Sequence, residues 1–189
     1  MFAHPTAGVF AAGSANGVSV VRRSLNGGAT WQTVDTFQLP KGNGTTAYGI
    51  GADAHGNLYA VGRAFAPYRG NSYAHWLVRK SANGGASWST VDDYQLFTTG
   101  DQVALEFGAD SLGNLYIAGW ASSTKTGGTY HWVLRKNPGG TGSWATTDDF
   151  VYASSAEVFA IAADGSGNVF VGGQGSPASG SVHWLVRKH

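Results

Sequence analysis

The segment GNLYAVG at residues 56–62 returns as GNLYIAG at 113–119 and again as GNVFVGG at 167–173. A second segment, HWLVRK at 75–80, returns as HWVLRK at 131–136 and as HWLVRK at 183–188. Self-similarity at a period of roughly 55 residues indicates that one structural unit is used several times. This repeat determines the architecture, because a unit of that length must bury its apolar face against its neighbours.

Each unit reads as four short strands, which we call A to D, separated by turns rich in glycine. The strands are rich in β-branched and aromatic residues and show no helical period. Four antiparallel strands per repeat predict an all-β fold, a β-propeller built from four-stranded blades. We expect one propeller, or a partial one, over residues 1–189, with repeats at approximately 1–46, 47–102, 103–156 and 157–189.

The first and last copies are incomplete. The first opens near the end of strand A, and the last stops after strand C, so the sequence predicts fourteen strands. A blade without its outer strand leaves strand C as an open edge, and open edges invite pairing. We therefore expect either a fragment of a longer propeller or a homo-oligomer that closes a ring through its open edges. A compact ring with two thinned blades is a third alternative.

Composition narrows the functional classes. The chain has 29 glycines, 13% aromatic residues, only 12% charged residues and a net charge of +1. Without a basic stripe, nucleic acid is not expected as a partner, and no apolar run is long enough for a membrane span. There is no cysteine, and we expect no metal and no cofactor. The composition suggests an exported bacterial protein, extracellular or periplasmic, whose signal peptide is absent from this chain.

Two motifs resemble known propeller repeats. The turns SLNGGATW at 24–31 and SANGGASW at 81–88 resemble the Asp-box, or bacterial neuraminidase repeat (BNR), with Asn26 and Asn83 in place of the aspartate. An amide still accepts the hydrogen bonds of the turn. The pattern Asp-x-x-Gly-Asn-x-Tyr-x-x-Gly is similar to the SBBP-type propeller repeat. Both resemblances imply a propeller and leave the function open, because such repeats occur in sialidases, lectins and assembly factors.

For a sialidase, the resemblance implies three arginines that grip a carboxylate, a Tyr/Glu nucleophile pair and an acid/base aspartate. The arginines at hand occupy one strand C position in every copy, namely Arg22, Arg79, Arg135 and Arg187. A ring places such residues one per blade and far apart, so this triad has no counterpart here. We expect these arginines to pair with the neighbouring strand, with Asp92 and Asp148 on strand D as diagonal cross-strand partners.

The other polar repeat positions also read as scaffold. His75, His131 and His183 recur with the period and lack metal-ligand spacing. Each repeat also carries a turn aspartate, which is expected to bond turn amides: Asp53, Asp110 and Asp164. The pairs at 92–93 and 148–149 point to opposite faces of a strand, so they do not share a site. We therefore predict no catalytic residue and no enzyme.

Departures from the period are the candidates for binding. Six of the seven tryptophans are repeat positions, expected beneath the turns or between blades, whereas Trp120 stands where other copies have Ser14, Arg63 and Gln174. It begins a variable B–C loop, and B–C and D–A loops emerge on one side of a propeller, here called the loop face. The candidate ligand-binding residues are Arg63, Tyr68, Arg69, Asn71, Trp120 and Tyr130. We predict a non-catalytic module that recognises a glycan or a protein; part of a sialidase-like glycoside hydrolase is the alternative.

Overall fold

The chain folds into four antiparallel β-sheets. The structure is a computed structural model that describes residues 1–189. The first sheet contains β1 (Phe2–His4), β2 (Gly8–Ala15), β3 (Val18–Ser24) and β4 (Gln32–Phe37), and the second contains β5 (Gly44–Ala52), β6 (Leu58–Tyr68), β7 (Asn71–Ser81) and β8 (Ser89–Tyr94). The third contains β9 (Asp101–Ala109), β10 (Leu115–Ser122), β11 (Tyr130–Asn137) and β12 (Ala145–Phe150), and the fourth contains β13 (Ser155–Ala163), β14 (Val169–Ser176) and β15 (His183–Lys188).

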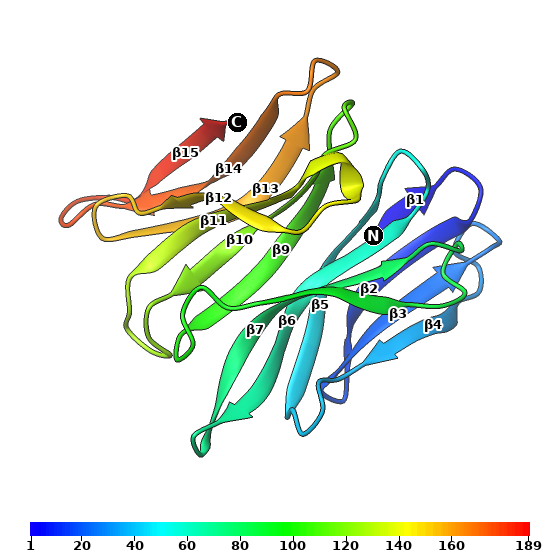
Figure 1. Cartoon of the computed structure of the whole chain (residues 1–189), viewed down its shortest axis with the longest axis horizontal. Coiled ribbons are helices and arrows are strands. Elements are labelled where there is room, and N and C mark those ends of the chain that lie inside the picture. Colours follow the sequence, from blue (N-terminus) through cyan, green and yellow to red (C-terminus); the bar gives the residue numbers. More distant parts are fainter.

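The four sheets are the predicted blades. Strand order follows the chain in every sheet, and the first strands of adjacent sheets, β1, β5, β9 and β13, contact one another. The sheets therefore stand side by side in an arc (Figure 1). The only helix is one 3-10 turn of three residues at Pro138–Gly140. The chain therefore contains no candidate for a membrane-spanning helix.

The strand count differs slightly from the prediction. Phe2–His4 forms a short strand A of its own, paired with Gly8–Phe10, which makes fifteen strands in place of fourteen. The last sheet has three strands and ends on the open edge of β15, as the repeat pattern predicts.

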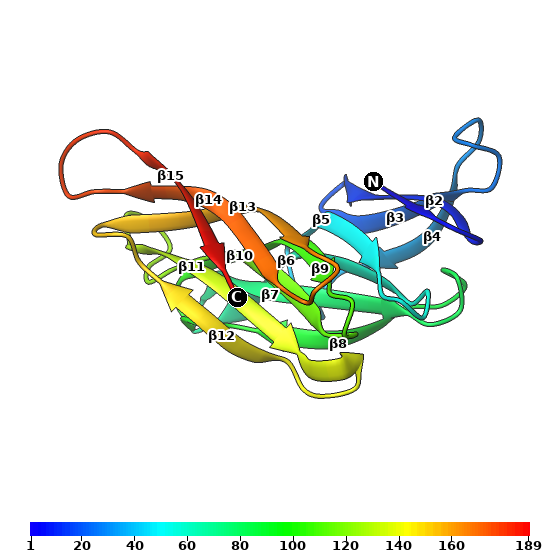
Figure 2. The ribbon, with the colours of Figure 1, turned by 90° about the horizontal axis from the view of Figure 1, so that it is seen from above.

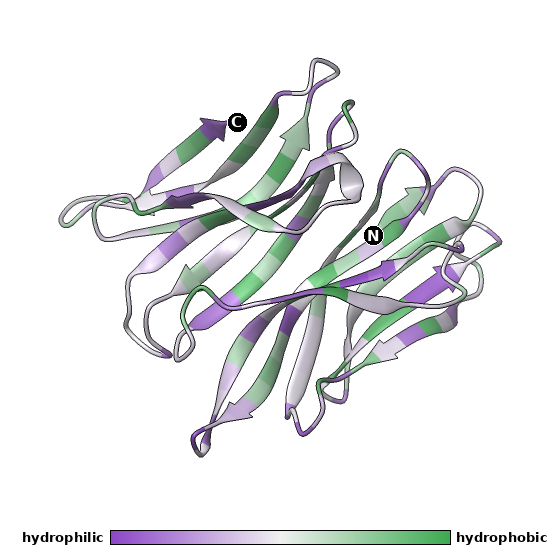
Figure 3. Ribbon diagram, viewed as in Figure 1, coloured by the Kyte–Doolittle hydropathy of each residue, from purple (hydrophilic) through white to green (hydrophobic).

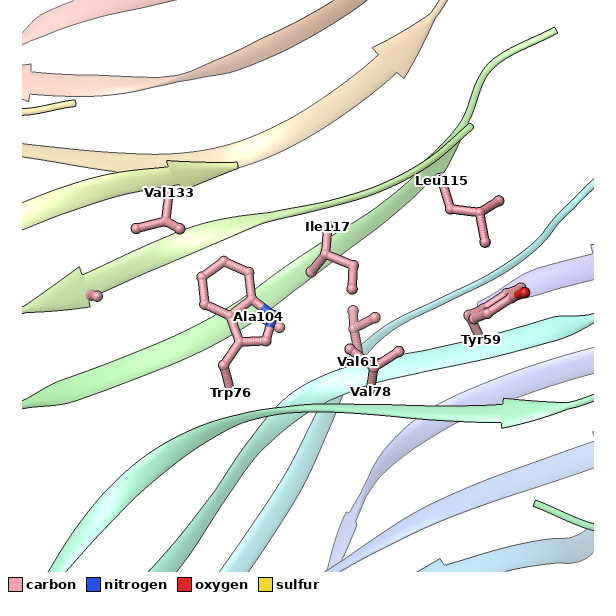
Figure 4. Close-up of a cluster of buried hydrophobic side chains, with 9 residues drawn as sticks. Tyr59, Val61, Trp76, Val78, Ala104, Leu115, Ile117 and Val133 are labelled. Atoms are coloured by element: carbon pink, nitrogen blue, oxygen red, sulfur yellow. The ribbon is translucent and has the colours of Figure 1, made fainter. Parts of the chain in front are cut away.

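Three separate apolar clusters hold the arc together, one at each junction between sheets. The central cluster joins Tyr59, Val61, Trp76 and Val78 of the second sheet to the face of the third sheet that carries Leu115, Ile117 and Val133 (Figure 4). Successive side chains of a strand point to opposite faces, and β6 and β10 bury consecutive residues at Leu58–Gly62 and Leu115–Gly119, in strands that are largely hydrophobic (Figure 3). Each inner sheet therefore buries one face against the preceding sheet and the other face against the following one.

A tryptophan set against a glycine recurs at two of these junctions. Trp76 and Trp132 are fully buried. The ring of Trp76 lies 3.1 Å from the position that a Cβ on Gly119 would occupy, and the ring of Trp132 lies 2.9 Å from that position on Gly173. The glycine is needed because no side chain fits between the strand and the indole.

The turns behave as their residues predict. Asp110 Oδ1 accepts the backbone N–H groups of Leu112 and Asn114, and its Oδ2 accepts the Asn114 amide and the Tyr116 hydroxyl. In the box turn, Asn83 Oδ1 accepts the N–H of Ser87, and its amide nitrogen donates to the Ser87 hydroxyl. Asparagine thus fills the place of the box aspartate.

The two outer faces of the arc have no neighbouring sheet. The first and last sheets lie at opposite ends of the molecule (Figure 2). On the last sheet, Trp184 is 71% exposed and Val186 is 59% exposed, whereas their equivalents Trp132 and Leu134 are fully buried. The expectation that all six repeat tryptophans are covered is therefore wrong for Trp184, because none of the four sheets packs against that face.

Candidate functional site

The strand C arginines pair between sheets, which corrects the prediction of pairing within one sheet. Arg79 binds Asp35 at 2.7 Å, Arg135 binds Asp92 at 3.0 Å and Arg187 binds Asp148 at 2.7 Å. In each case the carboxylate belongs to strand D of the preceding sheet. The aspartates at 92 and 148 are the predicted partners, but the arginine points out of its sheet toward the neighbour. Arg22 has no preceding sheet and keeps only a bond to the Trp31 carbonyl at 2.8 Å, which Arg79 and Arg135 also make to the equivalent tryptophan carbonyls.

The repeat histidines pair with the second aspartate of strand D. His75 contacts Asp93 and His131 contacts Asp149, each at 2.6 Å. Asp92 and Asp93 therefore point to opposite faces, as predicted. No three side chains of the metal-binding types gather in one place.

The guanidinium of Arg63, one of the candidate residues, is already bound within the fold. Its guanidinium lies 3.3 Å from Asp101 at the start of β9 and 5.0 Å from the ring centre of Phe65. This ion pair joins the second sheet to the third at the loop face. Arg63 therefore has a structural contact at the loop face, and the direct ligand contact that the sequence suggests stays a prediction.

Tyr68, Arg69 and Asn71 lie at the tip of a long hairpin. In place of the expected B–C loop between strands B and C, β6 and β7 pair as far as Tyr68 opposite Asn71. Only Arg69 and Gly70 remain as the turn, with φ of 49° and 78°, the two-residue type that suits a twisted hairpin. The hairpin therefore carries these side chains out to the loop face on a defined backbone.

Aromatic rings and cations from two sheets meet near this tip. The Tyr68 and Tyr73 rings are 6.3 Å apart and edge to face, and the Arg69 guanidinium lies 5.2 Å from the Tyr68 ring centre. Lys125, from the β10–β11 loop of the third sheet, lies 5.9 Å from the Tyr73 ring centre. We call Tyr68, Arg69, Tyr73 and Lys125 the tip cluster. The sequence analysis did not single out Tyr73 or Lys125, because their contact joins different repeats.

Trp120 and Tyr130 form a pair of their own at the base of the β10–β11 loop. Their ring centres are 5.0 Å apart with an interplanar angle of 61°, and both side chains are half-buried. Trp120 stands opposite Trp132 in the register of β10 and β11. The pair supports the loop that carries Lys125.

Glu106 is a carboxylate that the sequence analysis missed. It lies on the inner strand β9, where the second and fourth repeats have Gly49 and Ala160, so departure from the period was the available signal. Each of the nine aspartates accepts a hydrogen bond or forms an ion pair, and Glu157 accepts a hydrogen bond from Gln174. The Glu106 carboxylate has no such partner. Burial raises the pKa of Glu106 above its ordinary value.

Comparison with known proteins gives structural likeness only. No family model matches the chain, and no curated protein matches its sequence. A protein of unknown function from Dyadobacter fermentans is similar with a TM-score of 0.63 at 11% identity, over 90% of this chain and 54% of that one. The Hadza microbial sialidase Hz136 gives 0.60 at 13% identity, over 90% and 38%.

A third similar structure is the GH93 alpha-L-arabinofuranosidase of Fusarium graminearum, solved with arabinobiose. Its TM-score is 0.55 at 14% identity, over 90% of this chain and 54% of that one. This chain therefore spans about half the length of these proteins, or less. At such identities the likeness concerns the fold alone, and with the four stacked sheets it confirms the predicted class: the chain has the fold of β-propeller blades.

Proposed function

We propose that the chain is a non-catalytic recognition module that binds a glycan at the tip cluster of the loop face. The observation that carries the proposal is the gathering of two tyrosines and two cations from adjacent sheets, none of them at a conserved position of the repeat. A sugar ring presents an apolar face and a rim of hydroxyls. Tyrosine rings accept that apolar face, and Arg69, Lys125 and Asn71 supply hydrogen-bond donors to the rim.

The backbone at Arg69 supports this assignment. The equivalent turn of the first sheet is Asn16-Gly17, with φ of 53° and 76°. Asparagine tolerates the left-handed region, whereas an ordinary side chain costs about 1–2 kcal/mol there. Arginine at this turn is unfavourable for folding, and local strain is concentrated at functional positions.

The use of the carboxylates favours binding over catalysis. Glycosidases commonly work with two free carboxyl groups across the scissile bond. Here the aspartates serve ion pairs and turns, and Glu106 alone is unengaged. The related fold of a sialidase and of an arabinofuranosidase directs attention to glycans. A glycan-binding role agrees with the proposed location outside the cell or in the periplasm.

A glycan array probed with the labelled chain tests the proposal. We expect a defined set of glycans to bind and Tyr68→Ala to lose that signal. Tyr48→Ala is the matched control, because Tyr48 is similarly exposed, 43% against 39%, but lies on the inner strand β5. Equal binding by the Tyr68 variant would reject the site. No binding to any glycan would leave a protein ligand, which crosslinking through Lys125 would test.

A second candidate, part of a glycoside hydrolase, is favoured by Glu106. A half-buried carboxyl with a raised pKa is suited to donate a proton to a leaving group. Turnover of fluorogenic sialosides and arabinosides that is lost in Glu106→Gln would support this candidate. Absence of turnover in the unmodified chain would favour the binding module.

A further inference from the structure

We propose that two copies of this chain associate head to tail, with Trp184 of one copy seated on Gly13 of the next. The last sheet carries the tryptophan side of the tryptophan–glycine contact that recurs at the internal junctions. Trp184 and Val186 are exposed there, together with Phe170, whose equivalents Tyr59 and Tyr116 are buried. An apolar surface of this kind marks an interaction site.

The first sheet presents the receiving half. Gly13 pairs with Val20 in the register of β2 and β3, as Gly62 pairs with Leu77 and Gly119 with Val133, so it occupies the glycine position of the repeat. A Cβ on Gly119 or Gly173 would meet a tryptophan ring, whereas a Cβ on Gly13 would meet nothing within 4 Å. Gly13 lies in a shallow hollow of about 190 Å³, which is also lined by Ala11, Ala15, Val20 and Arg22.

The two faces therefore complement each other in the way that the internal junctions do. The Trp184 indole is exposed at one end of the arc, and Gly13 lies uncovered among small side chains at the other end. One copy cannot join its own ends, because the first and last sheets stand at opposite ends of the arc (Figure 2). A second copy supplies the matching face at each end.

The symmetry of this contact determines which oligomer forms. A joint between two different faces is heterologous and gives a ring if the rotation closes. Two copies supply eight blades, within the usual range of about four to eight. The faces proposed to meet, β13–β15 and the first sheet, would join through the apolar side chains described above.

Mass in solution provides the first test. A single chain is 19.6 kDa, and we expect sedimentation velocity to show twice that mass as concentration rises. Trp184→Ser and Gly13→Leu should each remain monomeric. Both keep the fold, because Trp184 is exposed and Gly13 faces open space without a positive φ. Leu112→Ser is the control: Leu112 is also 71% exposed but lies outside both faces, so its variant should still associate.

Mixing the two monomeric variants gives the decisive result. The Gly13→Leu chain keeps an intact last sheet and the Trp184→Ser chain keeps an intact first sheet, so the mixture should form dimers with one joint. Association of Gly13→Leu by itself would show contact between two last sheets and overturn the head-to-tail arrangement. A monomer at every concentration would also overturn it. Neither outcome bears on glycan binding at the tip cluster.

Discussion

Arg135 of the third sheet grips Asp92 of the second sheet through two parallel bonds, Nε to Oδ2 and Nη2 to Oδ1, each 3.0 Å long. The guanidinium also lies 3.7 Å from the ring centre of Tyr94 and donates to the Thr146 hydroxyl. The side chain is only 6% exposed. One residue thus ties together strand C of its own sheet, strand D of the same sheet and strand D of the preceding sheet.

Loss of this guanidinium should be costly. Arg135→Met leaves Asp92 buried without its partner, and removal of one member of a buried pair typically costs about 3–5 kcal/mol. We expect urea denaturation to show a loss of about 3 kcal/mol in unfolding free energy, because the ion pair is still partly exposed to solvent. Arg22→Met is the matched control: Arg22 has the same repeat position but no carboxylate, and it should change the unfolding free energy by less than about 1 kcal/mol. Equal losses would mean that the ion pair contributes nothing beyond side-chain packing.

Replacement of Gly119, the glycine that Trp76 packs against, should destabilise the fold even when the new residue is alanine. A Cβ at residue 119 would collide with the Val103 carbonyl and crowd the indole, and overpacking typically costs about 1–3 kcal/mol. Thermal unfolding of Gly119→Ala should show a loss of about 2 kcal/mol. Gly13→Ala, with open space at its Cβ, should stay within about 0.5 kcal/mol of the unmodified chain. A well-tolerated alanine at 119 would contradict the close approach of strand and ring.

The turn carboxylates should make stability fall in acid. Burial of Asp110 favours its neutral form, but the bonds from Asn114, Tyr116 and Leu112 outweigh it and hold the pKa below the ordinary 3.8. A lowered pKa means that the stabilisation is complete above 3.8 and is lost as pH falls through the folded-state value.

Tyr116→Phe removes one of these bonds, the 3.0 Å contact from the phenol to Asp110. We expect a loss of about 1 kcal/mol at neutral pH that narrows as pH falls below 3.8, together with a higher pKa of Asp110 by NMR titration. Tyr130→Phe is the control, because the Tyr130 hydroxyl has no partner in the chain. A difference that stays constant with pH would show that the phenol does not act through the carboxylate.

Arg69→Asn should exchange binding for stability. Asparagine accepts the left-handed backbone that Asn16 already adopts in the first sheet, so we expect a gain of about 0.5–1 kcal/mol in unfolding free energy. The same change removes a cation from the tip cluster and should weaken glycan binding. A variant that is more stable and binds equally well would remove Arg69 from the proposed site.

Periodic residues allowed the scaffold to be predicted from the sequence. The recurring segments at 56–62 and 75–80 specify strands B and C, and Asp53 and Asn83 specify their turns, because these bonds lie within a few residues of the chain. Pairing between repeats is different. The period places an arginine at position 79 but does not tell whether its carboxylate, Asp35, comes from the same sheet or from the preceding one.

The candidate site was predicted only in part, for related reasons. Tyr68, Arg69 and Asn71 were found as departures from the period, but the alternation of Ala64 and Ala66 with larger residues was the overlooked sign of a hairpin. Lys125 meets Tyr73 only because two sheets stand side by side, which a local pattern does not contain. The ion pair of Arg63 with Asp101 escaped notice for the same reason.

The division of the core into three clusters means that the molecule has no single centre. Each middle sheet is clamped from both sides, whereas each end sheet is clamped from one. Amide hydrogens in β6, β7, β10 and β11 should therefore exchange with solvent most slowly, and those in β13–β15 should exchange first. Heat or denaturant would peel such an arc from its ends, leaving a two-sheet remnant as the last ordered unit.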